Sequence, residues 1–222
     1  PSEYKTQKRG GVGVVDLNTK EEDVVTTLLT TSAHSDLLFF TNKGKVYSTK
    51  MYEIPEGRRA TKGKSIMNFL SMEGEESVTS VLAVRKDEWE GDWGLVMVTK
   101  NGVIKKSDAA SFKDVRRSGL IGITLKADDS LISARFVGKG DEMSLVTSNG
   151  QAIRFAEGDV RQMGRTAAGV TGMKLKKGDF IVSADVLKKG DKEKEILAVM
   201  ENGYGKTTPA KEYKVQNRGG SG

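Results

Sequence analysis

The chain has 222 residues, among them 26 glycines, three prolines and no cysteine, and its formal net charge is +6. The lack of cysteine excludes disulfides and thiolate metal sites, and the single histidine, His34, excludes a metal centre built from histidines. No apolar run approaches the roughly 20 residues that a membrane-spanning helix needs. We therefore expect a cytoplasmic protein with no membrane partner, and Pro1 in place of an initiator methionine indicates a fragment of a longer chain.

Apolar segments that end in a glycine turn recur four times, at intervals of about 50 residues. The turn glycines are Gly44, Gly102, Gly150 and Gly203, and an asparagine precedes all of them except Gly44. Asn-Gly is a strong signal for a tight hairpin turn, because both residues tolerate a positive φ angle. The sequence therefore predicts four β-hairpins.

Each repeat contains two further apolar segments besides its hairpin. One segment precedes each hairpin and is predicted as a strand, at residues 24–29, 78–84, 131–137 and 180–186. The other lies between the repeats, at residues 66–69, 120–125 and 170–175. Helical periodicity is nearly absent, and only residues 24–29 and 107–115 would allow a short helical turn. Repeats of four short strands predict an all-β, propeller-like array of about four blades, which we treat as a single domain over residues 1–222. A β-solenoid fits less well, since its rungs are shorter.

Basic residues recur in the connector that follows each predicted hairpin. The connector at residues 58–64 has four cations and no acid, and pairs or single cations occupy the equivalent positions elsewhere. Acidic residues gather instead just before the first strand of a repeat, at 21–23, 73–76, 128–129 and 179. A repeat fold places equivalent residues at equivalent sites, so we predict a basic belt beside an acidic edge.

A basic belt of this kind predicts binding to the phosphate backbone of duplex DNA. Cations beside small residues suit phosphate contacts by both side chains and amides. The sequence has no recognition helix and no paired aromatic residues for reading bases, so we expect sequence-tolerant binding along a curved surface. Two alternatives remain, a merely solvated face and a belt that meets an acidic protein. Against the second stands the scarcity of tryptophan and tyrosine anchors in the connectors.

Other candidate sites lack a convincing pattern. His34 lies near Asp36, but nothing places a nucleophile and base together, so we expect a loop residue and not a catalytic one. Trp89 and Trp93 lie in an acidic loop and are expected to pack over a sheet edge. The glycines after Arg9 lack the ending of a nucleotide phosphate loop, and the acidic pairs lack EF-hand spacing. We expect no catalytic residue and no metal site.

Residues 7–13, Gln-Lys-Arg-Gly-Gly-Val-Gly, resemble the gyrase-A box, whose pattern is glutamine, a cation, arginine, two glycines, a cation and glycine. Residues 34–56, 159–170 and 202–207 are similar to the C-terminal domain of the DNA gyrase A protein, and the likeness extends over essentially the whole chain. The paralogous protein of topoisomerase IV usually carries a degraded box. The box at residues 7–13 therefore favours gyrase.

The resemblance implies a β-pinwheel, a propeller-like disc in which neighbouring blades exchange strands and duplex DNA bends round the outer rim. It implies a non-catalytic domain without cofactors, because the cleaving tyrosine, the Mg²⁺ site and the ATPase belong to other regions of this type IIA topoisomerase. The protein partners would be the rest of gyrase A, together with gyrase B, in an A2B2 holoenzyme. In that enzyme the wrapped DNA would lead to ATP-dependent negative supercoiling.

The chain departs from the family pattern in two respects. Val12 replaces the second cation of the box, which removes one phosphate contact, and the chain holds four periods where the gyrase domain commonly has six blades. A second box-like segment at residues 216–222 lacks a cation at Asn217, so we assign the special closing role to the first copy. Its last four residues are either this second box or an addition to the chain. The expected DNA-binding residues are Gln7, Lys8, Arg9, Gly10, Gly11, Gly13, Arg58, Arg59, Lys62, Lys64, Arg116, Arg117, Arg161, Arg165 and Arg218.

Overall fold

The computed structural model describes residues 25–57, 62–190 and 194–222. Within these ranges all sheets are antiparallel, and the helical elements are short 3₁₀ turns. The strands are β1 (Asp36–Thr41), β2 (Lys45–Lys50), β3 (Val78–Val84), β4 (Trp93–Thr99), β5 (Val103–Asp108), β6 (Leu120–Ile121), β7 (Leu131–Gly138), β8 (Glu142–Thr147), β9 (Ala152–Ala156), β10 (Val170–Thr171), β11 (Ile181–Leu187), β12 (Glu195–Val199) and β13 (Gly205–Pro209). The 3₁₀ turns are η1 (Met51–Glu53), η2 (Ile66–Asn68), η3 (Lys86–Glu90), η4 (Ala109–Phe112), η5 (Glu157–Asp159) and η6 (Ala210–Glu212).

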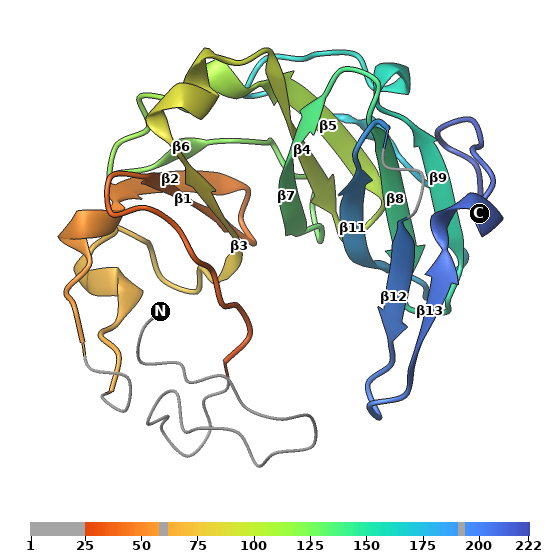
Figure 1. Ribbon diagram of the computed structural model, residues 1–222, viewed down its shortest axis with the longest axis horizontal. Coiled ribbons are helices and arrows are strands. Elements are labelled where there is room, and N and C mark those ends of the chain that lie inside the picture. Colours follow the sequence, from red (N-terminus) through yellow and green to blue (C-terminus); the bar gives the residue numbers. More distant parts are fainter. Residues whose placement is uncertain (1–24, 58–61, 191–193) are drawn as a thin grey trace.

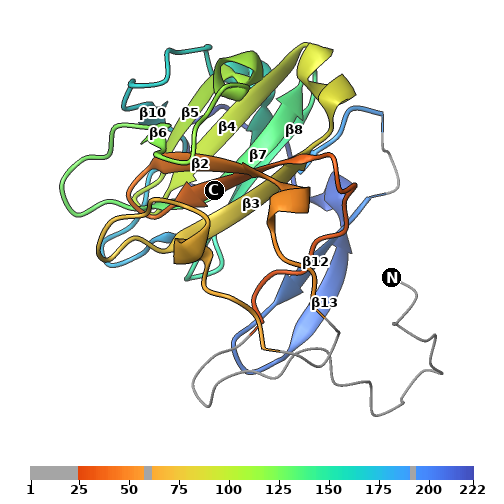
Figure 2. The same cartoon turned by 90° about the vertical axis from the view of Figure 1, so that its left-hand side faces the viewer.

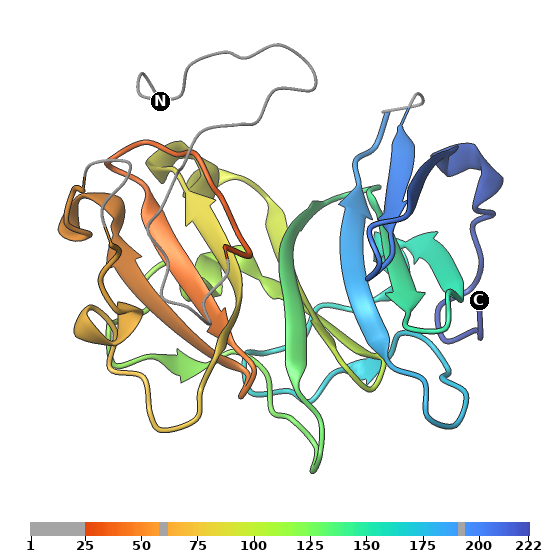
Figure 3. The same cartoon turned by 90° about the horizontal axis from the view of Figure 1, so that it is seen from below.

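The four predicted hairpins are confirmed as β1–β2, β4–β5, β8–β9 and β12–β13. Their turn glycines have φ angles of 74° at Gly44 and 80° at Gly102, Gly150 and Gly203, the left-handed region that glycine tolerates best. Four units built on these hairpins follow one another round an arc, in chain order (Figures 1 and 3). The β12–β13 hairpin extends beyond the other strands (Figures 1 and 2).

Neighbouring units exchange strands, which confirms the all-β, pinwheel-type fold. The first sheet has the order β3-β1-β2-β6 and the second β10-β5-β4-β7. In the first sheet, β6 is supplied by the connector after β5, and Leu120 pairs with Val46 of β2. In the second sheet, β10 comes from the connector after β9, and Val170 pairs with Ile104 of β5. The outer edge of each of these two blades is therefore completed by the next repeat.

The strands that precede hairpins belong to the blade before them. Thus β3, β7 and β11 pair with β1, β4 and β8, and they form the inner side of the arc (Figure 1). Hydrogen bonds join neighbouring inner strands, from the amide of Ala134 to Ser80 Oγ (3.1 Å) and from Ser133 Oγ to the carbonyl of Ala184 (3.3 Å). The strand that precedes a hairpin in the sequence therefore belongs to the previous blade.

Two predictions of strand content were wrong, and two more were confirmed only in part. Residues 25–29 form no strand, and residues 66–69 contain the 3₁₀ turn η2, whose Ser65 hydroxyl accepts a hydrogen bond from the amide of Met67 (3.3 Å). The segments at 120–125 and 170–175 pair over only two residues each. They then turn inward, since their apolar residues Ile123 and Met173 are buried in the core. The expected helical turn near residues 107–115 is present as η4.

The hydrophobic core consists of three clusters, two that lie between neighbouring blades and one that lies within the first blade. Leu38 and Phe40 of β1 pack in one cluster with Leu95 and Met97 of β4. Their neighbours Leu37 and Phe39 pack in a second cluster on the other face of the first blade. Successive strand residues point to opposite faces, so a strand buried on both faces needs a continuous apolar run. This explains the continuous apolar runs of β1 and β4, whereas β12 is largely exposed.

The exchanged segments dock on the hairpin turn of the preceding blade. The carbonyl of Gly44 accepts hydrogen bonds from the amides of Gly122 (2.8 Å) and Ile123 (3.1 Å). The carbonyl of Gly102 likewise accepts from Gly172 (2.7 Å) and Met173 (3.2 Å). The same two donors in successive repeats show that one junction is built twice.

The segment Gly219–Gly222 occupies the equivalent place on the third blade. A Cβ built on Gly222 would lie 2.8 Å from the carbonyl oxygen of Ala152 in β9, and the amide of Gly219 donates to Gly172 (2.8 Å). The carbonyl of Gly220 also accepts a hydrogen bond from Lys174 (2.8 Å). These four residues therefore form a third exchange segment and belong to the repeat.

Replacing Gly119 by alanine should destabilise the fold more than the same change at an open turn. Gly119 has φ 74°, and a Cβ there would lie 2.5 Å from the ring of buried Tyr47. At Gly150, φ is 80° but no atom lies within 4 Å, so Gly150→Ala should cost only the backbone strain of about 1–2 kcal/mol. Gly119→Ala should exceed that value, and Gly158→Ala, with open space and ordinary φ, should stay within about 0.5 kcal/mol. Urea unfolding of the three variants measures this order, and equal effects at Gly119 and Gly150 would contradict the packing argument.

Candidate nucleic-acid interface

The predicted basic residues that the structure describes fall into two groups, one with free and one with bound side chains. The free group is exposed and has no side-chain hydrogen bond or ion pair within the described ranges. Its members are Lys62, Lys64, Arg116, Arg161 and Arg165. The predicted residues Gln7, Lys8, Arg9, Gly10, Gly11, Gly13, Arg58 and Arg59 lie outside the described residues. The free cations belong to the connectors between hairpin and exchange segment, as the repeat pattern predicts.

Arg117 is bound by an acid of the preceding blade. Its Nη2 lies 2.7 Å from Oε1 of Glu53 in η1. This guanidinium, together with the Thr49 hydroxyl and the Lys50 amide, lowers the pKa of Glu53 to about 2. Arg117 therefore joins its connector to the preceding blade, and its neighbour Arg116 keeps an unpaired charge among the described residues.

Arg218 is bound by backbone carbonyls. Its Nε donates to the carbonyl of Asp159 (2.9 Å), and its Nη1 donates to the carbonyl of Thr171. The guanidinium thus holds the third connector at both of its ends. Arg218 was predicted to bind DNA from its place in the repeat. The repeat pattern does not reveal that its guanidinium binds backbone carbonyls instead of facing outward.

Two cations of the outer strands join each blade to the next and were not selected from the sequence. Lys106 Nζ in β5 donates to the carbonyl of Glu157 (3.1 Å), the first residue of η5. Arg154 in β9 donates to the carbonyl of Ala210 (2.6 Å), the first residue of η6. Both occupy the fourth position after their turn glycine, so the repeat builds the same contact twice. Their equal distance from the turn glycine was the signal in the sequence that could have identified these two residues.

Lys105 is a fully buried cation between two connectors. Its Nζ donates to the carbonyls of Gly122 and Arg165, which belong to successive exchange regions. Burial lowers the pKa of Lys105 to about 8, and the nearby guanidinium of Arg165 adds to the shift. The side chain fixes the backbone at Arg165 and leaves the Arg165 guanidinium exposed.

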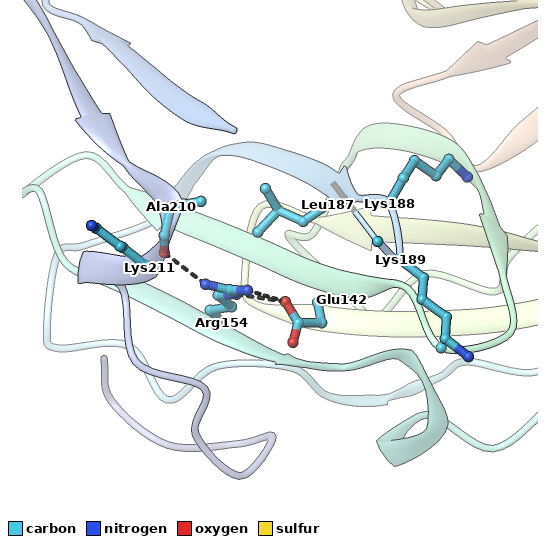
Figure 4. A pocket seen from close by; sticks show the side chains of 9 residues that line it. Glu142, Arg154, Leu187, Lys188, Lys189, Ala210 and Lys211 are labelled. Carbon is cyan, nitrogen blue, oxygen red and sulfur yellow. Dashed lines mark hydrogen bonds and ion pairs between the residues drawn. The ribbon is translucent and has the colours of Figure 1, made fainter. Parts of the chain in front are cut away.

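A groove lies at each of three successive blade junctions, between a hairpin and the 3₁₀ turn or connector of the following unit. The first junction groove, of about 680 Å³, is lined by Asp36, Ser48, Thr49, Lys50, Glu53, Lys113, Asp114, Val115, Arg116 and Arg117. The second, of about 550 Å³, is lined by Asp108, Ser111, Gln162, Met163, Gly164 and Arg165. The third, of about 390 Å³, is lined by Gly140, Glu142, Arg154, Leu187, Lys188, Lys189, Gly190, Ala210 and Lys211 (Figure 4). The first two grooves contain arginines selected from the sequence.

The acidic residues before each strand stabilise the hairpin turns. Asp129 accepts a hydrogen bond from the amide of Asn101 (3.0 Å), and Asp179 accepts one from the amide of Asn149 (3.2 Å). In the first blade, Glu73 instead forms an ion pair with Lys45 at 2.7 Å. These carboxylates therefore lie at the turns, away from the connectors. Among the described residues no cluster of three or more histidines and acids is suited to hold a metal ion.

The remaining candidate residues have ordinary surroundings. His34 is exposed, and its amide donates to Ser32 Oγ at 3.4 Å, as expected for a loop residue. Trp89 is buried, donates to Asp36 (3.0 Å) and packs edge-on against Phe136. Trp93 lies under the ammonium group of Lys188, 4.8 Å from the ring centre. The expected packing against a sheet is confirmed for Trp89, whereas Trp93 is the first residue of β4 and is exposed. No helix in the described ranges is long and apolar enough to cross a membrane.

Exchanged outer strands, inter-blade cores and junction grooves that each contain an arginine define a β-pinwheel repeat domain. Residues 2–32, 35–85, 95–137, 141–188 and 194–222 match the family described as "DNA gyrase C-terminal domain, beta-propeller", and the chain belongs to this family. The match includes residues 219–222, in agreement with their docking on the third blade.

The chain is similar to gyrase A proteins over its whole length. It is 44% identical over 221 residues to the DNA gyrase A protein of Staphylococcus epidermidis (strain ATCC 12228 / FDA PCI 1200), covering all of this chain and 24% of that protein. It is also 44% identical to the corresponding protein of Staphylococcus aureus (strain MRSA252), of which it covers 25%. The chain therefore spans about a quarter of the length of these relatives.

Two solved structures share the fold. One is a DNA gyrase A C-terminal domain, with a TM-score of 0.82 and 29% identity, covering 100% of this chain and 70% of that one. The other is the C-terminal domain of a DNA topoisomerase IV, with a TM-score of 0.78 and 32% identity, covering 93% and 63%. The relatives that match this chain over its whole length are gyrase A proteins, which confirms the predicted resemblance to gyrase A.

The buried ammonium group of Lys105 should make stability depend on pH. The folded chain releases this proton near pH 8, whereas the unfolded chain holds it up to the ordinary pKa of 10.5. Since the unfolded state then binds more protons, the free energy of unfolding of the wild type relative to Lys105→Met should rise between about pH 8 and 10.5. Urea unfolding across this range measures the difference. Arg165→Gln should raise the pKa of Lys105, and a falling difference would contradict the assignment.

Proposed function

We propose that this chain binds duplex DNA without sequence preference and bends it along the convex side of the arc. The recurrence of the junction grooves carries the proposal, because two successive grooves each contain an exposed arginine without a side-chain partner among the described residues, Arg116 and then Arg165. A regular series of separate cationic sites suits a polymer with evenly spaced phosphates better than it suits a single small anion.

The chemistry of the connectors favours contacts to phosphate and not to bases. The helical elements of the described ranges are all 3₁₀ turns of three to five residues. Such turns are too short to serve as a recognition helix in the major groove. Exposed arginines on glycine-containing connectors can reach phosphate oxygens with guanidinium and backbone amides. Lys62, Lys64 and Arg161 would extend these contacts, and Lys8, Arg9, Arg58 and Arg59 would add to them from outside the described residues.

Membership of this family supports a role for the proposed activity within a larger enzyme. We propose that residues 1–222 act as one non-catalytic wrapping domain of a gyrase A protein, together with gyrase B and the remainder of gyrase A in an A2B2 assembly in the cytoplasm. In that assembly the wrapped DNA would be passed in an ATP-dependent reaction that introduces negative supercoils. ATP and Mg²⁺ would act in other regions, so this domain would need no cofactor of its own.

Salt dependence of binding tests the proposed phosphate contacts. The affinity for duplexes of unrelated sequence should fall linearly with log salt. Arg116→Gln and Arg165→Gln should each make the slope of log K against log salt shallower by about 1. Arg117→Gln is a matched control, because its guanidinium already binds Glu53 at 2.7 Å, and its slope should change less. A flat salt dependence of the wild type, or a strong preference for one sequence, would refute the function.

The box at residues 7–13 should contribute more to bending than to affinity. If it closes the wrap, Lys8→Ala combined with Arg9→Ala should reduce DNA bending more than total binding. Nicked circular DNA can be bound, ligated and analysed for its trapped linking difference. The variant should trap a smaller difference than the wild type at equal saturation, and equal differences would remove the special role of the box.

A further inference from the structure

The third junction groove lies between the β8–β9 hairpin, the end of β11 and η6, and it contains none of the cations expected to bind DNA. Lysines from two different units line it, Lys188 and Lys189 after β11 and Lys211 in η6. Its floor is the ion pair between Arg154 and Glu142, whose Nε and Oε2 atoms are 2.6 Å apart. The groove is therefore basic at its sides and neutral at its floor.

The charges of the groove are unequally compensated. Arg154 is neutralised by Glu142, and Lys188 by Asp141 at 2.9 Å. Lys189 and Lys211 are exposed, and within the described ranges their ammonium groups have no hydrogen bond or ion pair. Figure 4 shows them on opposite sides of the Arg154–Glu142 pair, Lys211 beyond Arg154 and Lys189 beyond Glu142. Two unpaired cations thus flank a compensated floor.

The backbone under Lys189 is held in place. Its amide donates to Asp141 Oδ1 (2.8 Å), the carboxylate that also binds the ammonium group of Lys188. The stem of Lys189 passes over Gly140, where a Cβ would lie 2.9 Å from its Cδ. The position of this lysine beside the groove is therefore defined by contacts that leave its charge available.

We propose that the third junction groove is a further phosphate site, in which Lys189 and Lys211 contact the DNA backbone where the wrap passes from the third unit to the fourth. The inference rests on the proposed wrapping function. Arg218, the arginine expected to serve this unit, has its guanidinium occupied by the carbonyls of Asp159 and Thr171. DNA that follows the first two grooves would next pass the junction of the third and fourth units, where the two lysines supply the missing contact.

The lining of the groove favours phosphate over an acidic protein segment. Its uncharged members are Leu187, Ala210 and two glycines, and no aromatic residue lines it. Protein contacts of high affinity usually centre on large anchors in apolar pockets, which this groove does not offer. Two lysines on opposite sides of a neutral floor instead suit a charged backbone that crosses between them.

The salt dependence of a double variant tests this site. Lys189→Gln combined with Lys211→Gln should make the slope of log K against log salt shallower by about 2 for duplexes of any sequence. Lys189→Arg with Lys211→Arg should restore the wild-type slope, which a loss of folding would not allow. The matched control is Lys43→Gln with Lys86→Gln, which removes the same charge from exposed positions outside all three grooves and should shift the slope less.

The outcomes separate the site from the function it rests on. If the wild type shows no salt-dependent DNA binding, the proposed function fails. If the wild type binds with a steep slope but the groove variant matches the control variant, only the groove assignment is overturned. Loss of binding to polyglutamate with an unchanged DNA slope would likewise overturn it, in favour of an acidic protein partner.

Discussion

The structure depends on one repeated junction, the carbonyl of a turn glycine that accepts two amides from the next repeat. Gly44 binds the amides of residues 122 and 123 in this way, and Gly102 binds those of 172 and 173. The positive φ angle of the turn glycine makes the tight hairpin possible, and the hairpin presents the carbonyl to the neighbouring blade. Because the exchange segment docks at this turn, the connector before it must pass over the outer side of the arc. The location of the connectors, and of the exposed Arg116 and Arg165 that they carry, is therefore a consequence of how the blades are joined.

Cations serve two purposes that the sequence does not distinguish. Lys105, Arg154 and Arg218 donate to backbone carbonyls of adjacent connectors or 3₁₀ turns and thereby fix one blade against the next. Arg116 and Arg165 remain exposed on the connectors that those contacts hold in place. The inward group fixes the backbone of the connectors, so in the proposed complex with DNA less backbone entropy would be lost on binding. The net charge of +6 therefore does not reveal which cations hold the blades together and which remain exposed.

Local patterns predicted the hairpins, the turn glycines and the repeat, because Asn-Gly turns and continuous apolar strands are determined within a few residues. Pairing between distant segments was not accessible in the same way. The segments at residues 66–69 and 120–125 are both apolar, yet the first becomes a 3₁₀ turn and the second an exchanged strand, and only tertiary contacts decide between them. For the candidate site, the sequence predicted which connectors carry cations but not which of their side chains remain free. Which arginine of the pair Arg116 and Arg117 stays free depends on Glu53, about 60 residues away, and a repeat pattern does not contain that information.

The offset between the repeat in sequence and the blade in space has a consequence for how such a domain can change its size. The second and third units each give an exchange segment to the unit before them, at the same positions of its outer strand. A duplication or deletion of one whole period, made in register at any point, therefore regenerates every junction with equivalent donors and acceptors. A cut out of register would leave a turn carbonyl and an outer strand edge unpaired. Recombination in register can thus lengthen or shorten the array without the invention of a new interface.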